Sequence, residues 1–170
     1  MTIYQFTKNK INDLWQRASG FFSKSCLTKD PLASRPMASR QEYRNLASKA
    51  AKETYLEIDR FEHDTGYSIS REWFHNLALH TQVVVKKSPL CYAHGRIVYS
   101  ALSRYLKKCS TSEPVSIIET GTARGFSSLC MARALGDLNW PGKVLTVEVL
   151  PHRPRIDWNC NDDLYGKHPR

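Results

Sequence analysis

The sequence predicts an α/β protein in which a helical N-terminal part precedes one strand–helix–strand unit. Residues 115–118 and 144–147 are short runs of β-branched and other apolar residues, which is the pattern of buried strands. Residues 126–135 lie between these runs and have the apolar spacing of a helix. Because a helix joins the two strands, we expect them to be parallel, with a right-handed crossover.

The length of 170 residues predicts one domain, or one domain with an added helical segment. The chain has 25 Lys and Arg against 16 Asp and Glu, which gives a net charge of +9. Such a balance suggests an anionic partner, but the basic residues are dispersed and form only short doublets, as at Lys86 and Lys87. This dispersion favours a solvated basic surface over a nucleic-acid-binding one.

Five cysteines are widely separated and form no CxxC pair, so neither a disulfide framework nor a zinc site is predicted. Cys130 falls in the predicted helix 126–135 and is expected to be a small core residue. The first ten residues lack the apolar core of a signal peptide. No apolar run approaches the ~20 residues that span a bilayer. A reducing, cytoplasmic location fits these features.

The N-terminal segment, residues 1–38, is predicted to contain an amphipathic helix and a linker. Residues 5–26 place Ile11, Leu14 and Trp15 on one helical face, with Lys and Arg over much of the rest. Packing on the domain or on a partner is favoured over contact with a membrane surface. Residues 27–39 contain two prolines and several small polar residues, which is typical of a linker.

Residues 39–110 are predicted to form a helical extension. Ser39 and Glu42 have the spacing of a capping box, and the helical apolar pattern then continues to about residue 62 as one helix. The sequence HDTG ends this helix. His63 and Asp64 are adjacent there and could be read as a catalytic pair, but a solvent-exposed helix end is the favoured interpretation.

The apolar segment 70–85 leaves the choice between helix and loop open. Residues 92–109 are predicted to form a firmer helix, and its apolar side chains are expected to lie on one side. They are Ile97, Val98, Ala101, Leu102, Tyr105 and Leu106. The histidines of this part, His75, His80 and His94, lack a common metal-ligand spacing, so no metal site is predicted.

The turn after the first strand carries the chemistry of the sequence. The strand ends in Glu119, and Gly121 and Gly125 then let the backbone bend and let a ligand approach without meeting a Cβ. The helix that follows presents N–H groups and the positive end of its dipole. The second strand ends in Glu148, whose carboxylate can accept two hydrogen bonds from a ribose diol.

Two other nucleotide-binding motifs are not satisfied by this turn. The dinucleotide motif GxGxxG would need glycine where Ala123 and Phe126 stand, and the phosphate-binding motif GxxxxGK[ST] does not occur. A nicotinamide or nucleotide-phosphate binder is therefore the least favoured of the functions considered.

The sequence ETGTARGFSS at residues 119–128 resembles motif I of the class I S-adenosylmethionine-dependent methyltransferases. Its form is similar to that of a bacterial subgroup that includes sugar and small-molecule O-methyltransferases, with Ala123 replacing a glycine often found there. The resemblance covers about the last third of the chain. It implies that residues 111–170 are part of a Rossmann-like sheet that binds S-adenosyl-L-methionine, with a small molecule or a sugar as methyl acceptor.

The same resemblance implies roles for single residues. Gly121 and Gly125 would line the methionine part of the cofactor, Glu119 would orient its amino end, and Glu148 would hold the ribose hydroxyls. The remaining cofactor-binding positions of the turn would be Thr120, Thr122 and Ala123. The alternative, that the glycines serve only tight packing, stays open.

The sheet of this family has further strands, whereas only two candidates occur here. Because both runs are continuously apolar, we expect burial on both faces and neighbouring strands. A truncated product, a gene fragment or a partner-dependent chain is therefore expected, with a tendency to self-associate. The catalytic base is not assigned: His152 follows the second strand, but a plain loop residue is favoured. The alternative function is a non-catalytic, basic helical interaction protein with the βαβ unit as scaffold.

Overall fold

The computed structural model describes residues 38–86, 89–111 and 113–149. These residues form five helices and two strands. In chain order they are α2 (Arg40–Ala51), α3 (Leu56–Thr65), α4 (Arg71–Thr81), α5 (His94–Lys108), β1 (Val115–Thr120), α6 (Phe126–Asp137) and β2 (Gly142–Val147). The helix predicted at 5–26, most of the linker, His152 and the rest of the segment after residue 149 lie outside the described residues.

The predicted strand–helix–strand unit is confirmed. β1 and β2 pair in parallel, with Val115 opposite Gly142 and Thr120 opposite Val147, and α6 connects them. Gly142 allows the two strands to start close together, because a Cβ there would lie 2.9 Å from the carbonyl oxygen of Val115. Helix α6 runs to Asp137, two residues beyond the predicted 126–135, and includes Gly136 in its last turn.

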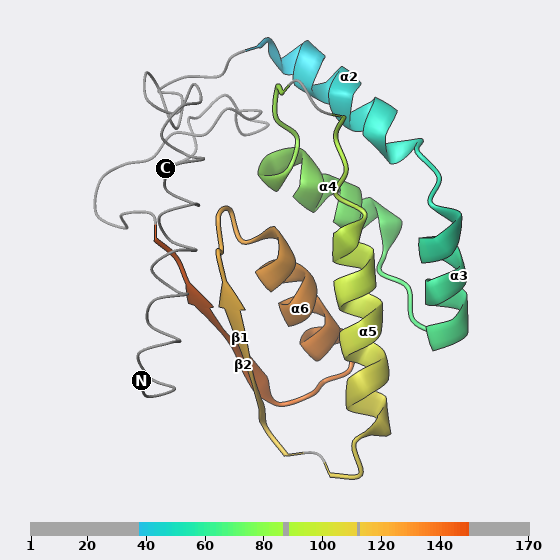
Figure 1. Cartoon of the computed structure of the whole chain (residues 1–170), viewed down its shortest axis with the longest axis vertical. Coiled ribbons are helices and arrows are strands. Elements are labelled where there is room, and N and C mark those ends of the chain that lie inside the picture. The colour runs from blue at the N-terminus through green and yellow to red at the C-terminus, as the bar shows by residue number, and fades with distance from the viewer. Residues whose placement is uncertain (1–37, 87–88, 112, 150–170) are drawn as a thin grey trace, which may run out of the picture.

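Burial of the sheet differs from the expectation. Side chains along β1 alternate between partly buried and exposed, and Ile118 is 69% exposed. On β2, Leu145 and Val147 are also exposed. Figure 1 gives the reason, since the described helices all lie on the α6 side of the two strands. The prediction that both faces of both strands are buried is therefore wrong for the described residues.

The helix predicted from residue 40 to about 62 is two helices. Ser39 and Glu42 form the predicted capping box at the start of α2, with the Ser39 N–H donating to Glu42 Oε2 at 2.7 Å. The chain leaves the helix at Lys52 and re-enters one after Tyr55. Helix α2 packs on α4, whereas α3 packs on α5, so the break lets consecutive segments cover different partners.

Helix α3 ends as predicted at Gly66, which has a φ of 76° and accepts the left-handed conformation of a helix C-cap. The open assignment of segment 70–85 is settled, because the segment forms helix α4 as far as Thr81 and is irregular from Gln82. Helix α5 confirms the prediction for residues 92–109 within a few residues at each end.

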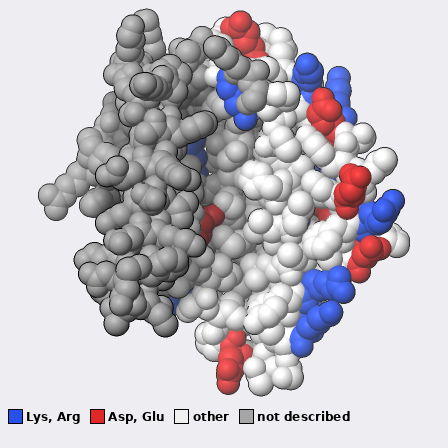
Figure 2. Space-filling view, in the orientation of Figure 1, with Lys and Arg blue, Asp and Glu red and all other residues white. Residues whose placement is uncertain are grey.

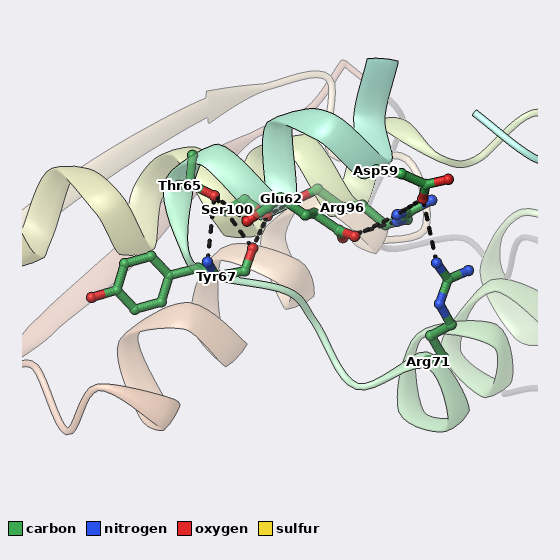
Figure 3. A network of polar contacts seen from close by, with 7 residues as sticks. All are labelled: Asp59, Glu62, Thr65, Tyr67, Arg71, Arg96 and Ser100. Atoms are coloured by element: carbon green, nitrogen blue, oxygen red, sulfur yellow. Dashed lines mark hydrogen bonds and ion pairs between the residues drawn. The ribbon is translucent and has the colours of Figure 1, made fainter. Parts of the chain in front are cut away.

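The buried side of α5 matches the prediction only in part: Leu106 is fully buried, and Val98 and Leu102 are partly buried. Ile97, Ala101 and Tyr105 are exposed, while Arg96, Ser100 and Ser103 are buried. Arg96 and Ser100 are buried because they meet polar partners on the segment 59–67, and Figure 3 shows these partners converging on α5. Apolar spacing therefore predicted the apolar part of the buried face and missed its polar part.

Arg96 is the centre of this polar contact. It is 5% exposed, and its Nε donates to Glu62 Oε1 at 2.9 Å while its Nη2 donates to both Glu62 and Asp59. The hydrogen bond from Arg96 is the main cause of the lowered pKa of Asp59. One turn further along α5, the Ser100 hydroxyl donates to the carbonyl oxygen of Tyr67 at 2.7 Å. These bonds join α3 and the segment after it to α5.

One hydrophobic core spans the helical part and the βαβ unit. Phe126 of α6 packs against Phe74 of α4 and Tyr92, with ring centroids 5.5 and 6.3 Å apart. Gly95 of α5 lies so close to α6 that a Cβ there would be 2.7 Å from the Phe126 ring and 2.9 Å from the sulfur of Cys130. Residues 39–110 therefore contribute most of the core on which α6 rests.

The cysteines are expected to differ sharply in reactivity. Cys130 is fully buried, as predicted, and burial raises the pKa of its thiol to about 12, whereas Cys91 is exposed. Because only the thiolate reacts, iodoacetamide at pH 8 should label Cys91 in the native protein and leave Cys130 unmodified. Peptide mass spectrometry checks this, with urea-unfolded protein as the control in which both are labelled. Equal labelling of the two in the native protein would contradict this packing of α6.

Candidate functional site

The turn between β1 and α6 has the backbone that the glycines predict. Gly121 and Gly125 have φ angles of 80° and 75°, the left-handed region in which glycine is favoured. A Cβ built at either position would meet nothing within 4 Å. Since neither glycine is required by close packing, the interpretation that they serve only tight packing finds no support in the geometry. Both leave an open backbone surface.

Ala123, between the glycines, also has a positive φ, of 47°. A left-handed conformation costs an L-residue with a Cβ roughly 1–2 kcal/mol. Two hydrogen bonds hold the turn around it: Ala123 N–H donates to Glu148 at 2.6 Å, and Gly125 N–H donates to the Thr122 carbonyl oxygen at 2.7 Å. The turn therefore has a defined, partly strained shape, which is common at ligand sites.

Glu148 lies at this turn, as the predicted parallel arrangement requires. It follows β2 directly, and its carboxylate accepts from the backbone N–H groups of Ala123 and Val149, at 2.6 and 2.7 Å. The structure thus brings together the end of the second strand and the turn after the first. A carboxylate oxygen can accept more than one hydrogen bond, so a carboxylate at this place can also bind a ligand hydroxyl.

Glu119 faces the start of α6. Its two carboxylate oxygens accept hydrogen bonds from the hydroxyl groups of Ser127 and Ser128 in the first turn of that helix. The side chain is partly buried and sits where the positive end of the helix dipole favours a negative charge. The two serines were not singled out from the sequence, although two hydroxyl residues just after the second glycine were a visible signal.

The two threonines of the turn differ. Thr120 is the last residue of β1 and is exposed. Thr122 is partly buried, and its Oγ1 is enclosed without a hydrogen-bond partner among the described residues. A buried hydroxyl without a partner is unusual in folded proteins and commonly marks a position where a ligand or water binds. Of the seven predicted cofactor-binding residues, Glu119, Gly121, Thr122, Ala123, Gly125 and Glu148 all contribute to one turn and its supports.

The histidines occupy different settings. The side chain of His63 is 89% exposed and lies 3.4 Å from Asp64, which fits the favoured solvent-exposed role. His75 Nδ1 lies 3.1 Å from the Tyr92 hydroxyl, and burial lowers its pKa. His94 is in ring contact with Phe126, the residue after Gly125. Within the described residues no cluster of three or more His, Cys, Asp or Glu side chains could hold a metal ion.

The charges on the surface are mixed. Figure 2 shows Lys and Arg side chains interspersed with Asp and Glu side chains along the rim of the face that is drawn. This distribution agrees with a solvated basic surface.

No helix in the described part of the chain is both long and apolar enough to cross a bilayer. Comparisons with protein-family models, with curated proteins and with solved structures found no match to this chain.

The site can therefore be described by its own chemistry. It combines an open glycine backbone, an enclosed hydroxyl and two carboxylates, all at the end of the sheet where β1 and β2 finish. Open α/β sheets bind ligands at the carboxyl ends of their strands. Two carboxylates suit a ligand that carries an ammonium group or several hydroxyl groups, and they disfavour a phosphate. A nucleoside with a cationic tail has both of these features.

Proposed function

We propose that the turn from Glu119 to Gly125 binds S-adenosyl-L-methionine and that the chain belongs to an S-adenosylmethionine-dependent methyltransferase. The observation that carries the proposal is the arrangement of Glu119 and Glu148 on either side of one open glycine turn. The resemblance of ETGTARGFSS to motif I supports it. The proposed reaction is O-methyl transfer to a small molecule or a sugar.

Each residue has a role set by its place. Glu148 accepts hydrogen bonds from the ribose hydroxyls while its contact with the Ala123 N–H holds the turn in shape. Glu119, held by Ser127 and Ser128, presents negative charge to the ammonium group of the methionine part. When bound, S-adenosylmethionine supplies a methyl group on a positively charged sulfur. The main contribution of the chain is then to position this group against the acceptor.

Replacing Glu148 with alanine is expected to weaken binding of S-adenosylhomocysteine at least tenfold, because it removes charge-assisted hydrogen bonds to the ribose and loosens the turn at Ala123. A tenfold loss equals about 1.4 kcal/mol. Isothermal calorimetry measures the affinity, and circular dichroism confirms that the helices persist. Glu148→Gln keeps an acceptor oxygen, so its affinity for S-adenosylhomocysteine should lie between those of the wild-type chain and Glu148→Ala.

Glu113→Ala is the matched control for this experiment. Glu113 is exposed and lies just before β1, at the opposite end of that strand from the turn. This variant removes the same charge without touching the site, so the affinity should stay that of the wild-type chain. If Glu148→Ala and Glu113→Ala bind S-adenosylhomocysteine equally well, Glu148 is a structural residue and the ribose assignment fails.

A further inference from the structure

His94 contacts the residue that directly follows the glycine turn, although it belongs to the helical part of the chain. It is the first residue of α5, and its ring lies edge-on to Phe126 with the centroids 5.2 Å apart. Phe126 directly follows Gly125 and begins α6. Figure 1 shows that α5 and α6 lie side by side and that both begin at the end of the sheet where β1 and β2 finish. His94 therefore lies at the same end of the fold as the glycine turn.

The approach of α5 to this place is built into the packing. Gly95, next to His94, has no side chain that would hold the helices apart, and a Cβ there would clash with the Phe126 ring at 2.7 Å. Phe126 in turn is buried against Phe74 and Tyr92. The position of His94 relative to the turn is thus fixed by the core.

The imidazole of His94 has unused hydrogen-bonding capacity. Neither ring nitrogen makes a hydrogen bond within the described residues, in contrast to His75, whose Nδ1 lies 3.1 Å from the Tyr92 hydroxyl. The residue is accessible to solvent, and partial burial lowers its pKa from the ordinary value of about 6.5. The ring is therefore neutral at pH 7, with one nitrogen able to accept a proton.

We propose that His94 lines the ligand site on the side of the transferable methyl group and receives the hydroxyl of the methyl acceptor at its free imidazole nitrogen. This inference rests on the proposed function. The hydroxyl proton passes to the imidazole as the acceptor oxygen takes the methyl group. The positive charge that the sulfur loses then appears on the ring, so atoms and charge balance. A hydroxylated acceptor is the substrate class that needs such a proton acceptor.

The test compares the effects of two ligands on the pKa of His94. S-adenosylmethionine and S-adenosylhomocysteine differ by one methyl group and one positive charge. A like charge close to an imidazole disfavours its protonated form. We expect the pKa of His94 to be lower with S-adenosylmethionine than with S-adenosylhomocysteine by about one unit, the size expected for a unit charge several ångströms away. NMR of the ring protons of the whole chain, titrated with acid, measures this difference.

The experiment has an internal control and a clear assignment. His63 has a side chain that is 89% exposed and lies at the end of α3, so its ring signals should be the same with either ligand. His94→Gln identifies the His94 signal by its loss, at an exposed position where glutamine is compatible with a helix.

The possible outcomes separate this inference from the proposed function. If both ligands bind, as shown by calorimetry, and the pKa of His94 is equal in the two complexes, the inference is overturned while the proposed function stands. If neither ligand binds, both are overturned. A lower pKa of His94 with S-adenosylmethionine, together with unchanged ring signals of His63, supports both.

Discussion

Replacing Gly121 with valine is expected to abolish binding of S-adenosylhomocysteine, with a loss of affinity of roughly a hundredfold or more, or about 2.8 kcal/mol. Two effects combine. Gly121 has a φ of 80°, which a β-branched residue adopts only at a cost, so the turn would change shape. The valine side chain would also occupy the open space beside the backbone, where the ligand is proposed to lie. Isothermal calorimetry on folded protein measures the loss.

Gly66→Val is a close control, because it separates backbone strain from loss of the site. Gly66 has a φ of 76°, and a Cβ at this position would meet nothing within 4 Å, as at Gly121, but Gly66 ends α3. The variant should lose stability by about 1–2 kcal/mol from the same left-handed strain. Its affinity for S-adenosylhomocysteine should not change. Equal affinities of the two valine variants would remove Gly121 from the site.

Replacing Arg96 with alanine is expected to lower the free energy of unfolding by about 3–5 kcal/mol, the usual cost of removing one partner of a buried ion pair. The change leaves Glu62, which is 9% exposed, without its cation and opens a gap between α3 and α5. Urea denaturation followed by circular dichroism measures the loss. A loss of this size would unfold a substantial fraction of a marginally stable domain.

Two further variants define the cause of that loss. Arg71 also contacts Asp59, at 3.4 Å, but its side chain is 63% exposed, so Arg71→Ala should cost about 1 kcal/mol or less. The double variant Arg96→Met with Glu62→Met replaces the pair by apolar side chains and should recover most of the stability. A cost for Arg96→Ala no larger than that for Arg71→Ala would show that the ion pair does not join the two helices.

The βαβ unit could be predicted from the sequence because its signals are local. The apolar runs, the strand-end acids and the glycines all lie within 35 consecutive residues, 115–149, and the structure places Glu148 at the Gly121 turn as parallel pairing requires. The capping box at Ser39 and the helix end at Gly66 are local signals of the same kind.

The errors occurred where distant residues decide the structure. The break after Lys52 contains neither glycine nor proline, so nothing local interrupts the helical pattern. Arg96 and Ser100 are buried because Glu62 and the Tyr67 carbonyl lie opposite them, 34 and 33 residues away in the sequence. Apolar spacing cannot report such polar pairing, and for this reason the prediction missed the polar part of the buried side of α5.

The candidate site shows the same division between local and distant signals. The turn and its two acids were found from motif and spacing, whereas the place of His94 depends on the close packing of Gly95 against Phe126. No sequence spacing connects His94 with Phe126, because their contact arises only when α5 packs beside α6. This contact between the helical part and the start of α6 could therefore be found only from the structure.

The most direct test of the central claim is a calorimetric titration of the whole chain with S-adenosylhomocysteine. We expect one molecule to bind per chain with a dissociation constant below roughly 100 μM, or about −5.5 kcal/mol. Circular dichroism on the same sample should show the helical signal of α2 to α6. If the chain binds with a dissociation constant above about 1 mM, its binding free energy is weaker than about −4.1 kcal/mol. A folded chain that gives no heat of binding at about 1 mM ligand would therefore contradict the assignment of the turn.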